Sequence, residues 1–318
     1  MNVHPLRALL VLVLGLCSVT TLQADLVWTP QDGWFWPSSA VAATPEEIHA
    51  NADLAFEAKA YRDAAYGYQV LINTYPTYEQ IDAVFVRKLE AQYLARDFDA
   101  ALETIEVVLK RDPDSETLQR VLRSKYEIGS AYLTGTTRSI LGIPFSAGSY
   151  GAEILDSIVQ RYPFLPFSDD ALFRVAEYYF GRKQYAEAEF VYEKLIQDYP
   201  QSDWVGLAEY QIGDAAFRRL KGVEYDMSPL DKAERYFNRY LSNHPGGDRA
   251  DETRAILREI DELRAERLYR VARFYLRLEK SRAAGLYLQR ILKEHPRAAT
   301  ANKARADLTQ LAEGWVQE

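Results

Sequence analysis

Between residues 168 and 200 the hydrophobic positions form two stripes with helical spacing, separated by a short polar break. In the first stripe Leu172, Val175 and Ala176 recur at intervals of three and four residues, and the second stripe keeps the same period. Pro200 ends the second stripe, because proline has no N–H to donate and its ring clashes with the preceding turn. The pattern predicts a helix–turn–helix hairpin of about 34 residues.

The same plan recurs along the chain from Thr44 onward. A proline ends each predicted hairpin, a small residue holds one position of its second helix, and a bulky residue follows four positions later. The prolines are Pro76, Pro113, Pro163, Pro200, Pro245 and Pro296; the small residues are Ala64, Ala101, Gly151, Ala188, Ala233 and Ala284; the bulky ones are Tyr68, Ile105, Leu155, Tyr192, Phe237 and Leu288. This pattern resembles the tetratricopeptide repeat and predicts an all-α, right-handed solenoid of about six helical hairpins.

Three stretches depart from the regular plan. Residues 135–148 and 221–229 are insertions, which we expect to be loops at one edge of the solenoid, often the binding edge. Apolar side chains of the first insertion can instead pack on the helix ends below: Ile140, Leu141, Ile143 and Phe145. Residues 249–278 predict one long helix with alternating charge, and residues 298–315 predict a closing C-terminal helix.

Residues 1–24 have the pattern of an export signal. An apolar run at 9–16 follows a positive charge, and Ala24 ends a cleavage-site pattern. The run is too short for a stable transmembrane anchor. The alternative is a lipoprotein signal in which Cys17 is acylated, although Leu16 stands where such a signal requires a small residue. The mature chain is expected to be soluble in an exported compartment or tethered there by lipid.

Residues 25–43 form an arm rich in tryptophan and proline, with neither a helical nor a strand period. One interpretation is that the arm lies over the first hairpin and covers its open end, because terminal repeats need a cap. The other is a contact with a partner or a membrane surface through Trp28, Trp34 and Trp36, because tryptophan suits interfaces that are apolar on one side and wet on the other.

Composition and charge argue against several classes of function. The net charge of −8 argues against nucleic-acid binding, which depends on lysine and arginine at phosphates. Cys17 is the single cysteine, so the mature chain has no disulfide and no cysteine-based metal site. His244 and His295 precede helix-ending prolines in separate repeats, which indicates a structural position. No phosphate-binding glycine loop or metal-ligating histidine pair appears. We expect a non-catalytic protein with no cofactor and no metal site.

Aromatic residues recur on the first helices of the hairpins at positions expected on the inner face of a solenoid, and four of the six helices also carry an acidic residue there. We interpret them as a groove with aromatic walls and an acidic floor, suited to an extended segment with aromatic and basic side chains. In the alternative, the aromatic residues pack helix on helix and the carboxylates are solvated. The candidate residues are Asp53, Phe56, Glu90, Tyr93, Tyr126, Phe173, Glu177, Phe180, Tyr210, Asp214, Phe217, Tyr269 and Arg273.

A longer resemblance rests on the run RYPFLPFS at 161–168, an insertion with Asp and Pro at 225–229, and the run VARFY at 271–275. Over residues 161–311 the chain resembles the outer-membrane protein assembly factor BamD family. The resemblance implies BamD-like repeats at 164–318, preceded by further repeats at 44–163.

What the resemblance implies is a periplasmic subunit at the inner face of the outer membrane. Such a subunit docks on the barrel-forming subunit of the β-barrel assembly machinery and receives unfolded outer-membrane proteins. The alternative is a periplasmic tetratricopeptide adaptor that coordinates cell-envelope or peptidoglycan enzymes, with the same fold and other partners.

Overall fold

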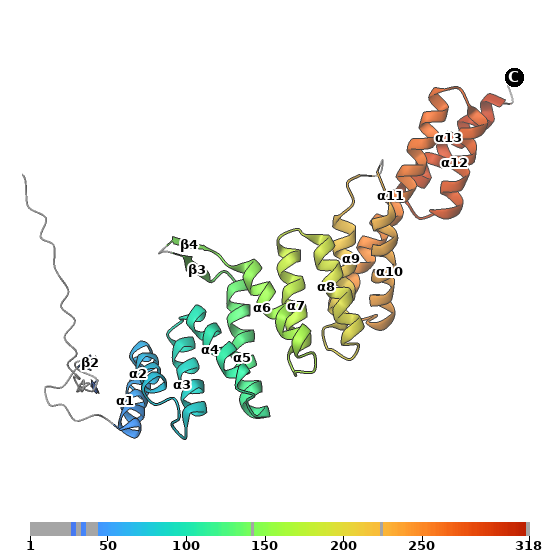
Figure 1. The fold of residues 1–318 in the computed structure, drawn as a ribbon. Coiled ribbons are helices and arrows are strands. Elements are labelled where there is room, and N and C mark those ends of the chain that lie inside the picture. Colours follow the sequence, from blue (N-terminus) through green and yellow to red (C-terminus); the bar gives the residue numbers. More distant parts are fainter. Residues whose placement is uncertain (1–26, 30–32, 36–43, 141–142, 223–224, 316–318) are drawn as a thin grey trace, which may run out of the picture. The chain divides into compact units, whose positions relative to one another are not determined.

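A computed structural model describes residues 27–29, 33–35, 44–140, 143–222 and 225–315 (Figure 1). The chain divides into two compact units, residues 1–121 and residues 122–318, called unit 1 and unit 2 below. In each unit, successive helices pack against one another as a stack of hairpins. The expected all-helical repeat fold is confirmed.

Unit 1 holds the first two hairpins and the beginning of a fifth helix. A short antiparallel strand pair, β1 with β2, precedes them, and β1 lies beside α1. The elements are β1 (Val27–Thr29), β2 (Gly33–Phe35), α1 (Pro45–Glu57), α2 (Tyr61–Thr74), α3 (Ile81–Leu94), α4 (Phe98–Lys110) and the start of α5 (Ser115–Leu133).

Unit 2 continues from α5 through the remaining repeats to the closing helix. Its elements are β3 (Thr137–Ile140), β4 (Ile143–Ser146), α6 (Gly148–Arg161), α7 (Ser168–Gly181), α8 (Tyr185–Asp198), α9 (Val205–Arg218), α10 (Ser228–Asn243), α11 (Ala250–Arg277), α12 (Ser281–Glu294) and α13 (Ala299–Trp315). The single long helix and the closing helix expected from the sequence are both present. Within the described part of the chain, no helix combines the length and apolar character needed to cross a bilayer.

The hairpins share one local turn. The residue after the C-cap adopts a left-handed conformation in four of them, at Lys59, Arg96, Lys183 and Glu279, with φ between 58° and 61°. The next amide then reaches back to a carbonyl in the last turn of the helix, as Gln184 N does to Tyr179 O at 2.9 Å. This is the Schellman type of helix ending, which satisfies carbonyls that the helix leaves open. The repeat is therefore fixed by its turn as well as by its core.

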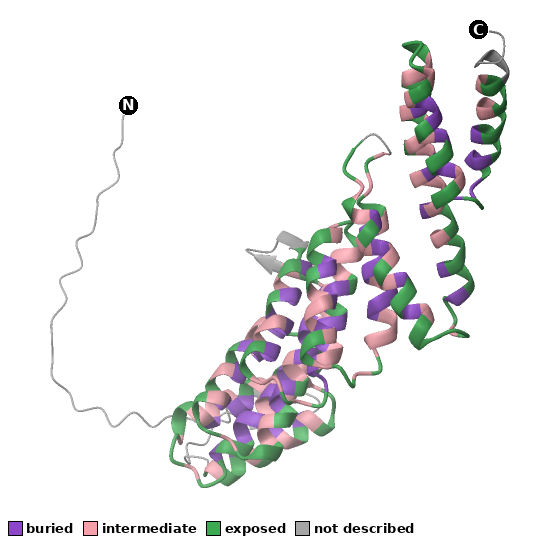
Figure 2. Ribbon diagram, turned by 90° about the vertical axis from the view of Figure 1, so that its right-hand side faces the viewer, coloured by how far each residue is buried: buried purple, intermediate pink, exposed green. Residues whose placement is uncertain are grey.

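The small and bulky positions of the second helices form the core of the hairpins. All five alanines at the small position are fully buried, and so are the six bulky residues that follow them. Figure 2 shows buried residues (purple) along the sides where helices contact one another. Gly151 takes the small position in α6, where an added Cβ would lie 2.6 Å from the carbonyl oxygen of Gly129 in α5. Glycine is used here because another backbone passes too close for a side chain.

Two stretches contain strand pairs that the sequence pattern did not predict. The insertion at 135–148 is a β-hairpin, with β3 paired antiparallel to β4, and the arm at 25–43 contains the β1–β2 pair. Strands of three or four residues are too short to show a period, whereas β-branched residues such as Thr137 and Val27 favour extended pairing. The side chains at 139–145 lie outside the described residues, so the packing of Ile140, Leu141, Ile143 and Phe145 stays a prediction.

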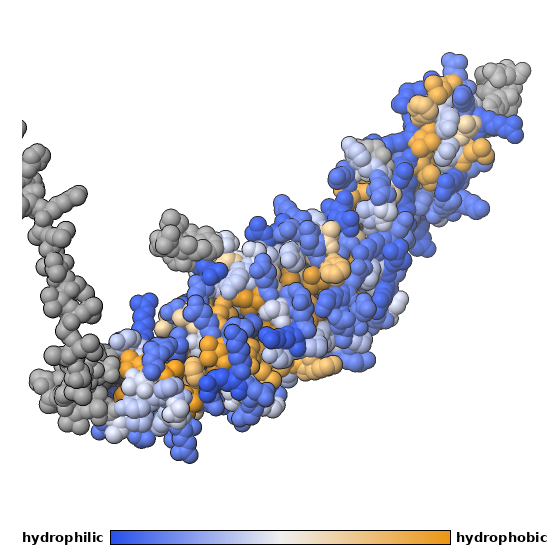
Figure 3. Space-filling view, viewed as in Figure 1, coloured by the Kyte–Doolittle hydropathy of each residue, from blue (hydrophilic) through white to orange (hydrophobic). Residues whose placement is uncertain are grey.

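Several large hydrophobic side chains remain exposed on a mostly hydrophilic surface (Figure 3). Phe164 is 97% exposed, Phe190 68% and Leu286 65%. Single exposed hydrophobic residues are common, and of these three Phe190 also lines a pocket.

We expect Gly151→Ala to lower the stability of the chain. The added methyl would press against the backbone of α5, and overpacking of this kind costs about 1–3 kcal/mol. Gly181→Ala is the matched control, because no atom lies within 4 Å of a Cβ added there. Urea unfolding followed by circular dichroism measures both variants, and equal midpoints for the two would contradict the close approach of α5 and α6.

Candidate partner-binding site

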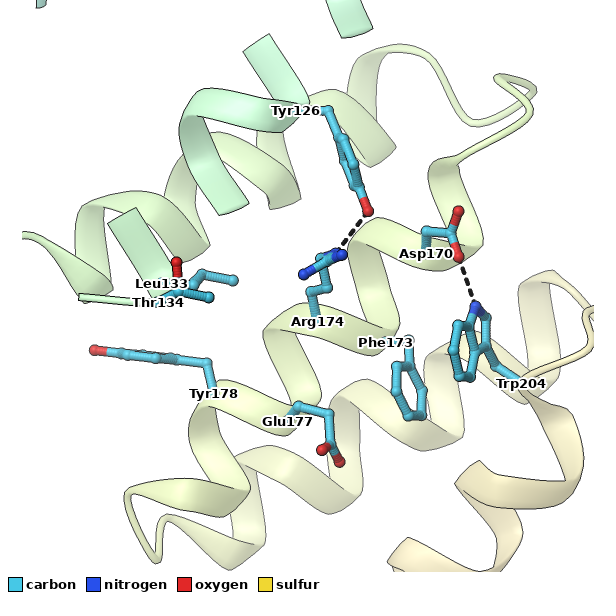
Figure 4. A pocket seen from close by; sticks show the side chains of 9 residues that line it. All are labelled: Tyr126, Leu133, Thr134, Asp170, Phe173, Arg174, Glu177, Tyr178 and Trp204. Atoms are coloured by element: carbon cyan, nitrogen blue, oxygen red, sulfur yellow. Dashed lines mark hydrogen bonds between the residues drawn. The ribbon is translucent and has the colours of Figure 1, made fainter. Parts of the chain in front are cut away.

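Three of the predicted groove residues meet at one pocket in unit 2. Tyr126 comes from α5, and Phe173 and Glu177 come from α7 (Figure 4). The pocket has a volume of about 490 Å³. Its other lining residues are Leu133, Thr134, Asp170, Arg174, Tyr178 and Trp204.

The aromatic wall of the pocket is held in place by stacking and by a hydrogen bond. The rings of Phe173 and Trp204 stack with centroids 4.2 Å apart and an angle of 13° between their planes. The indole N–H of Trp204 donates to Asp170 Oδ1 at 2.6 Å. Trp204 is half-buried, and a tryptophan that leaves water usually finds such a partner for its N–H. The wall is thus fixed before any ligand arrives.

Arg174 lies between this wall and Tyr126. Its Nε donates to the Tyr126 hydroxyl at 2.7 Å. Within the described residues, no carboxylate forms an ion pair with its guanidinium, which is exposed. The remaining N–H groups of Arg174 are available to a carbonyl or carboxylate, because guanidinium carries five donors.

Glu177 provides the acidic side of the pocket. It accepts hydrogen bonds from the buried Tyr192 hydroxyl and from Gln211 Nε2, the latter at 2.8 Å. Burial, followed by this hydrogen bond, raises the pKa of Tyr192 far above its ordinary range. Unit 1 has the same arrangement, in which the Tyr68 hydroxyl donates to Asp53 at 2.5 Å. The repeat therefore uses a buried tyrosine to orient a carboxylate on its first helix.

The other acidic candidates are paired within the chain. In unit 1, Arg87 approaches Asp53 at 3.6 Å and Glu90 at 3.3 Å, and its guanidinium lies 4.3 Å from the centre of the Phe56 ring. In unit 2, Arg218 Nε donates to the buried Asp214 at 2.8 Å. Arginines that sequence reasoning did not include thus offset much of the expected acidic floor.

Most of the remaining aromatic candidates pack between helices, as the alternative interpretation had it. Tyr210 is buried against Phe237 and Tyr240, and Phe217 packs on the same cluster. Ring contacts with the next helix and a hydrogen bond account for three others: Tyr93 with Phe98, Phe180 with Tyr185, and Tyr269 with Asp307. Arg273 is exposed on α11.

The N-terminal candidates are described only in part. The backbones of Trp28 and Trp34 face each other across the β1–β2 pair, and nothing is described of their side chains. Cys17 and Trp36 lie outside the described residues. Their roles as a lipidation site and as contacts remain predictions.

Among the lining residues that sequence reasoning missed are Asp170, Arg174, Tyr178 and Trp204. The first three share α7 with the predicted residues and lie one helical turn or less from them. Trp204 belongs to the next repeat and reaches the pocket through packing between repeats. One feature of the sequence could have identified Trp204. It stands just before the start of α9, where a side chain is more exposed to solvent than an aromatic residue of the core usually is.

Comparison with models of protein families identifies the family of this chain. The model of the YfiO family, described as outer membrane lipoproteins, matches residues 146–313, more than half of the chain. The chain belongs to the YfiO family of outer membrane lipoproteins. The match includes the α7 side of the pocket and Trp204, and it leaves all of unit 1 outside. No curated protein matches the chain.

The chain also shows likeness to solved structures, among them two that are described as repeat proteins. A tetratricopeptide repeat protein from Parabacteroides merdae has 15% identity over 85% of this chain and 86% of its own, with a TM-score of 0.34. The C-terminal part of a repeat protein from Cytophaga hutchinsonii has 15% identity over 82% and 87%, with a TM-score of 0.37. PilW, a type IV pilus biogenesis factor, has 14% identity over 83% and 99%, with a TM-score of 0.28.

We expect Tyr192→Phe to lower the free energy of unfolding by roughly 1 kcal/mol at neutral pH, because the hydrogen bond to Glu177 is lost. The pKa of Tyr192 is higher in the folded chain than its unfolded value of about 10. The stabilisation is therefore fully present below about pH 10 and is lost as the pH rises further. The difference between wild type and variant should shrink in alkaline solution.

Urea unfolding at neutral pH and above pH 10 measures this difference. Tyr225→Phe is the matched control, because Tyr225 is 56% exposed. A Tyr192→Phe variant as stable as the wild type at neutral pH, or a difference that does not change with pH, would contradict the role of this bond.

Proposed function

We propose that this chain is a non-catalytic scaffold subunit of the outer-membrane β-barrel assembly machinery. It binds the barrel-forming subunit and segments of unfolded outer-membrane proteins at the inner face of the outer membrane. The observation that carries the proposal is the YfiO family match over residues 146–313, which includes most of the pocket described above.

The chemistry of the pocket supports an extended, aromatic segment as its ligand. The Phe173–Trp204 stack offers an apolar surface on which a further aromatic ring can pack. An unfolded segment also brings backbone N–H and C=O groups that need partners when they leave water. Glu177 supplies acceptor oxygens and Arg174 supplies donors, so both kinds of backbone group find a partner in the same pocket.

The charged residues that line the pocket favour basic segments over acidic ones. Asp170 and Glu177 outnumber Arg174 among the charged lining residues. A segment that places a lysine or arginine near its aromatic residue gains an ion pair at the exposed Glu177, whereas an acidic segment is repelled. This preference affects association rate and selectivity more than affinity.

The family supports attachment of the chain to a membrane. Its description as outer membrane lipoproteins favours acylation of Cys17 over cleavage after Ala24, and the lipid would tether the chain at the periplasmic leaflet.

We expect a large outer-membrane β-barrel protein to copurify with the full chain from host membranes in mild detergent. The control is a parallel purification with Phe173→Ala and Trp204→Ala, which should keep the barrel-forming subunit but lose bound unfolded substrate if the pocket receives it. Cell-wall enzymes in place of a β-barrel protein would contradict the proposal and favour the adaptor alternative. An intact mass that begins at unmodified Asp25 would contradict the lipid tether.

A further inference from the structure

Unit 2 has a second pocket that shares no residue with the first. Its volume is about 460 Å³, and it is formed by α6, α7 and α8. Its lining residues are Ala152, Glu153, Asp156, Val175, Tyr179, Ala186, Glu187, Phe190 and Val191. Val175 and Tyr179 lie two positions along α7 from Phe173 and Glu177. Since each residue turns a helix by about 100°, the two pockets use opposite faces of α7.

The second pocket has at its edge an exposed aromatic side chain, Phe190, which lies outside the hydrophobic core. Phe190 is 68% exposed, although it lies two residues from Ala188 in the hairpin core. The same repeat position is Tyr66 in α2, Glu153 in α6 and Leu286 in α12. In α8 this position adjoins Val191 and the Glu153 of the neighbouring α6. A large apolar side chain at the edge of a pocket gains stability when a partner covers it.

The rim of the second pocket is acidic and has no basic counterpart. Glu153 and Glu187 are exposed, and Asp156 accepts a hydrogen bond from Gln160. Within the described residues, none of the three carboxylates forms an ion pair with a lysine or arginine. Burial is the main cause that raises the pKa of Tyr179, and electrostatic interactions with Tyr178 and with the carboxylates of Asp156, Glu187 and Glu153 raise it further. The three carboxylates therefore act on one small region.

We propose that this second pocket docks a segment of another protein in which an apolar side chain is flanked by lysines or arginines. The apolar side chain fills the space beside Phe190 and Val191, and the basic side chains pair with Glu153, Asp156 and Glu187. Both the apolar contact and the ion pairs are needed for binding, because ion pairs at an exposed surface alone contribute little binding energy. The site goes beyond the proposed function, since neither the barrel subunit nor an unfolded substrate is needed to occupy it.

A second copy of this chain is the competing occupant. Helix α12 exposes Leu286 between Arg282 and Arg290, one helical turn away on either side, so it has the required chemistry. Such a contact would join two different surfaces, and contacts of that type continue into rings or filaments unless the rotation closes. The net charge of −8 also opposes self-association. A different, basic protein is the better match.

Photo-crosslinking in the native host tests this proposal with the full chain. A benzoyl-phenylalanine in place of Phe190 keeps the ring and reports what covers it. We expect a crosslink to one protein, at a peptide in which mass spectrometry finds an apolar residue flanked by lysine or arginine. The yield should fall several-fold when Glu153→Gln and Glu187→Gln are added, because these changes remove charge from exposed positions and leave the core intact.

The matched control places the same probe at Leu286, which has the same repeat position but basic surroundings. This probe should not capture the same partner. The proposal is overturned by a yield at Phe190 no higher than at Leu286, by a crosslinked peptide without basic residues, by a crosslink to a second copy of this chain, or by a yield that the two glutamine variants leave unchanged. Circular dichroism confirms that the variants fold.

Discussion

The structure depends on one close approach, between the two helices of each hairpin at the small position of the second helix. Ala188 is fully buried there, and Gly151 takes its place where the backbone of α5 passes too near for a side chain. This approach brings the bulky residue four positions later into the hairpin core. Where that residue is tyrosine, its hydroxyl reaches a carboxylate on the first helix, as Tyr192 does with Glu177. The packing of the core thus also orients the charge that faces the candidate site.

The fold could be predicted from the sequence because its determinants are local and repeated. Helical spacing and the helix-ending prolines each act within a few residues, and the structure confirms the helices that they predict. The short strands could not be predicted in this way, since they depend on pairing between segments without a period.

The candidate binding site was predicted only in part. Tyr210 and Phe173 look alike in the repeat pattern, yet Tyr210 is enclosed by Phe237 and Tyr240, whereas Phe173 forms a pocket wall with Trp204. The contact between Phe173 and Trp204 joins two repeats, and no single repeat contains it.

One helix, α7, contributes to two pockets of different chemistry. The face with Phe173 and Glu177 offers an aromatic stack and both hydrogen-bond donors and acceptors, which suits an extended chain. The face with Val175 and Tyr179 adjoins an exposed phenylalanine and three carboxylates, which suits a basic segment. Because the two faces are opposite, two partners can bind the same repeat together. Under the two proposals, this arrangement would let the chain hold a client at one face of α7 and a second partner at the other.

Hydrogen–deuterium exchange of the full chain tests the account most directly, with and without a synthetic peptide of the terminal strand of an outer-membrane β-barrel protein. The account predicts slower exchange of amides at the beginning of α7 and at the beginning of α9, around Trp204, with no change in α2. A peptide with its aromatic residues replaced by serine should give no protection. Protection limited to unit 1, or equal protection by both peptides, would contradict the assignment of the Phe173–Trp204 pocket as the site that receives unfolded outer-membrane proteins.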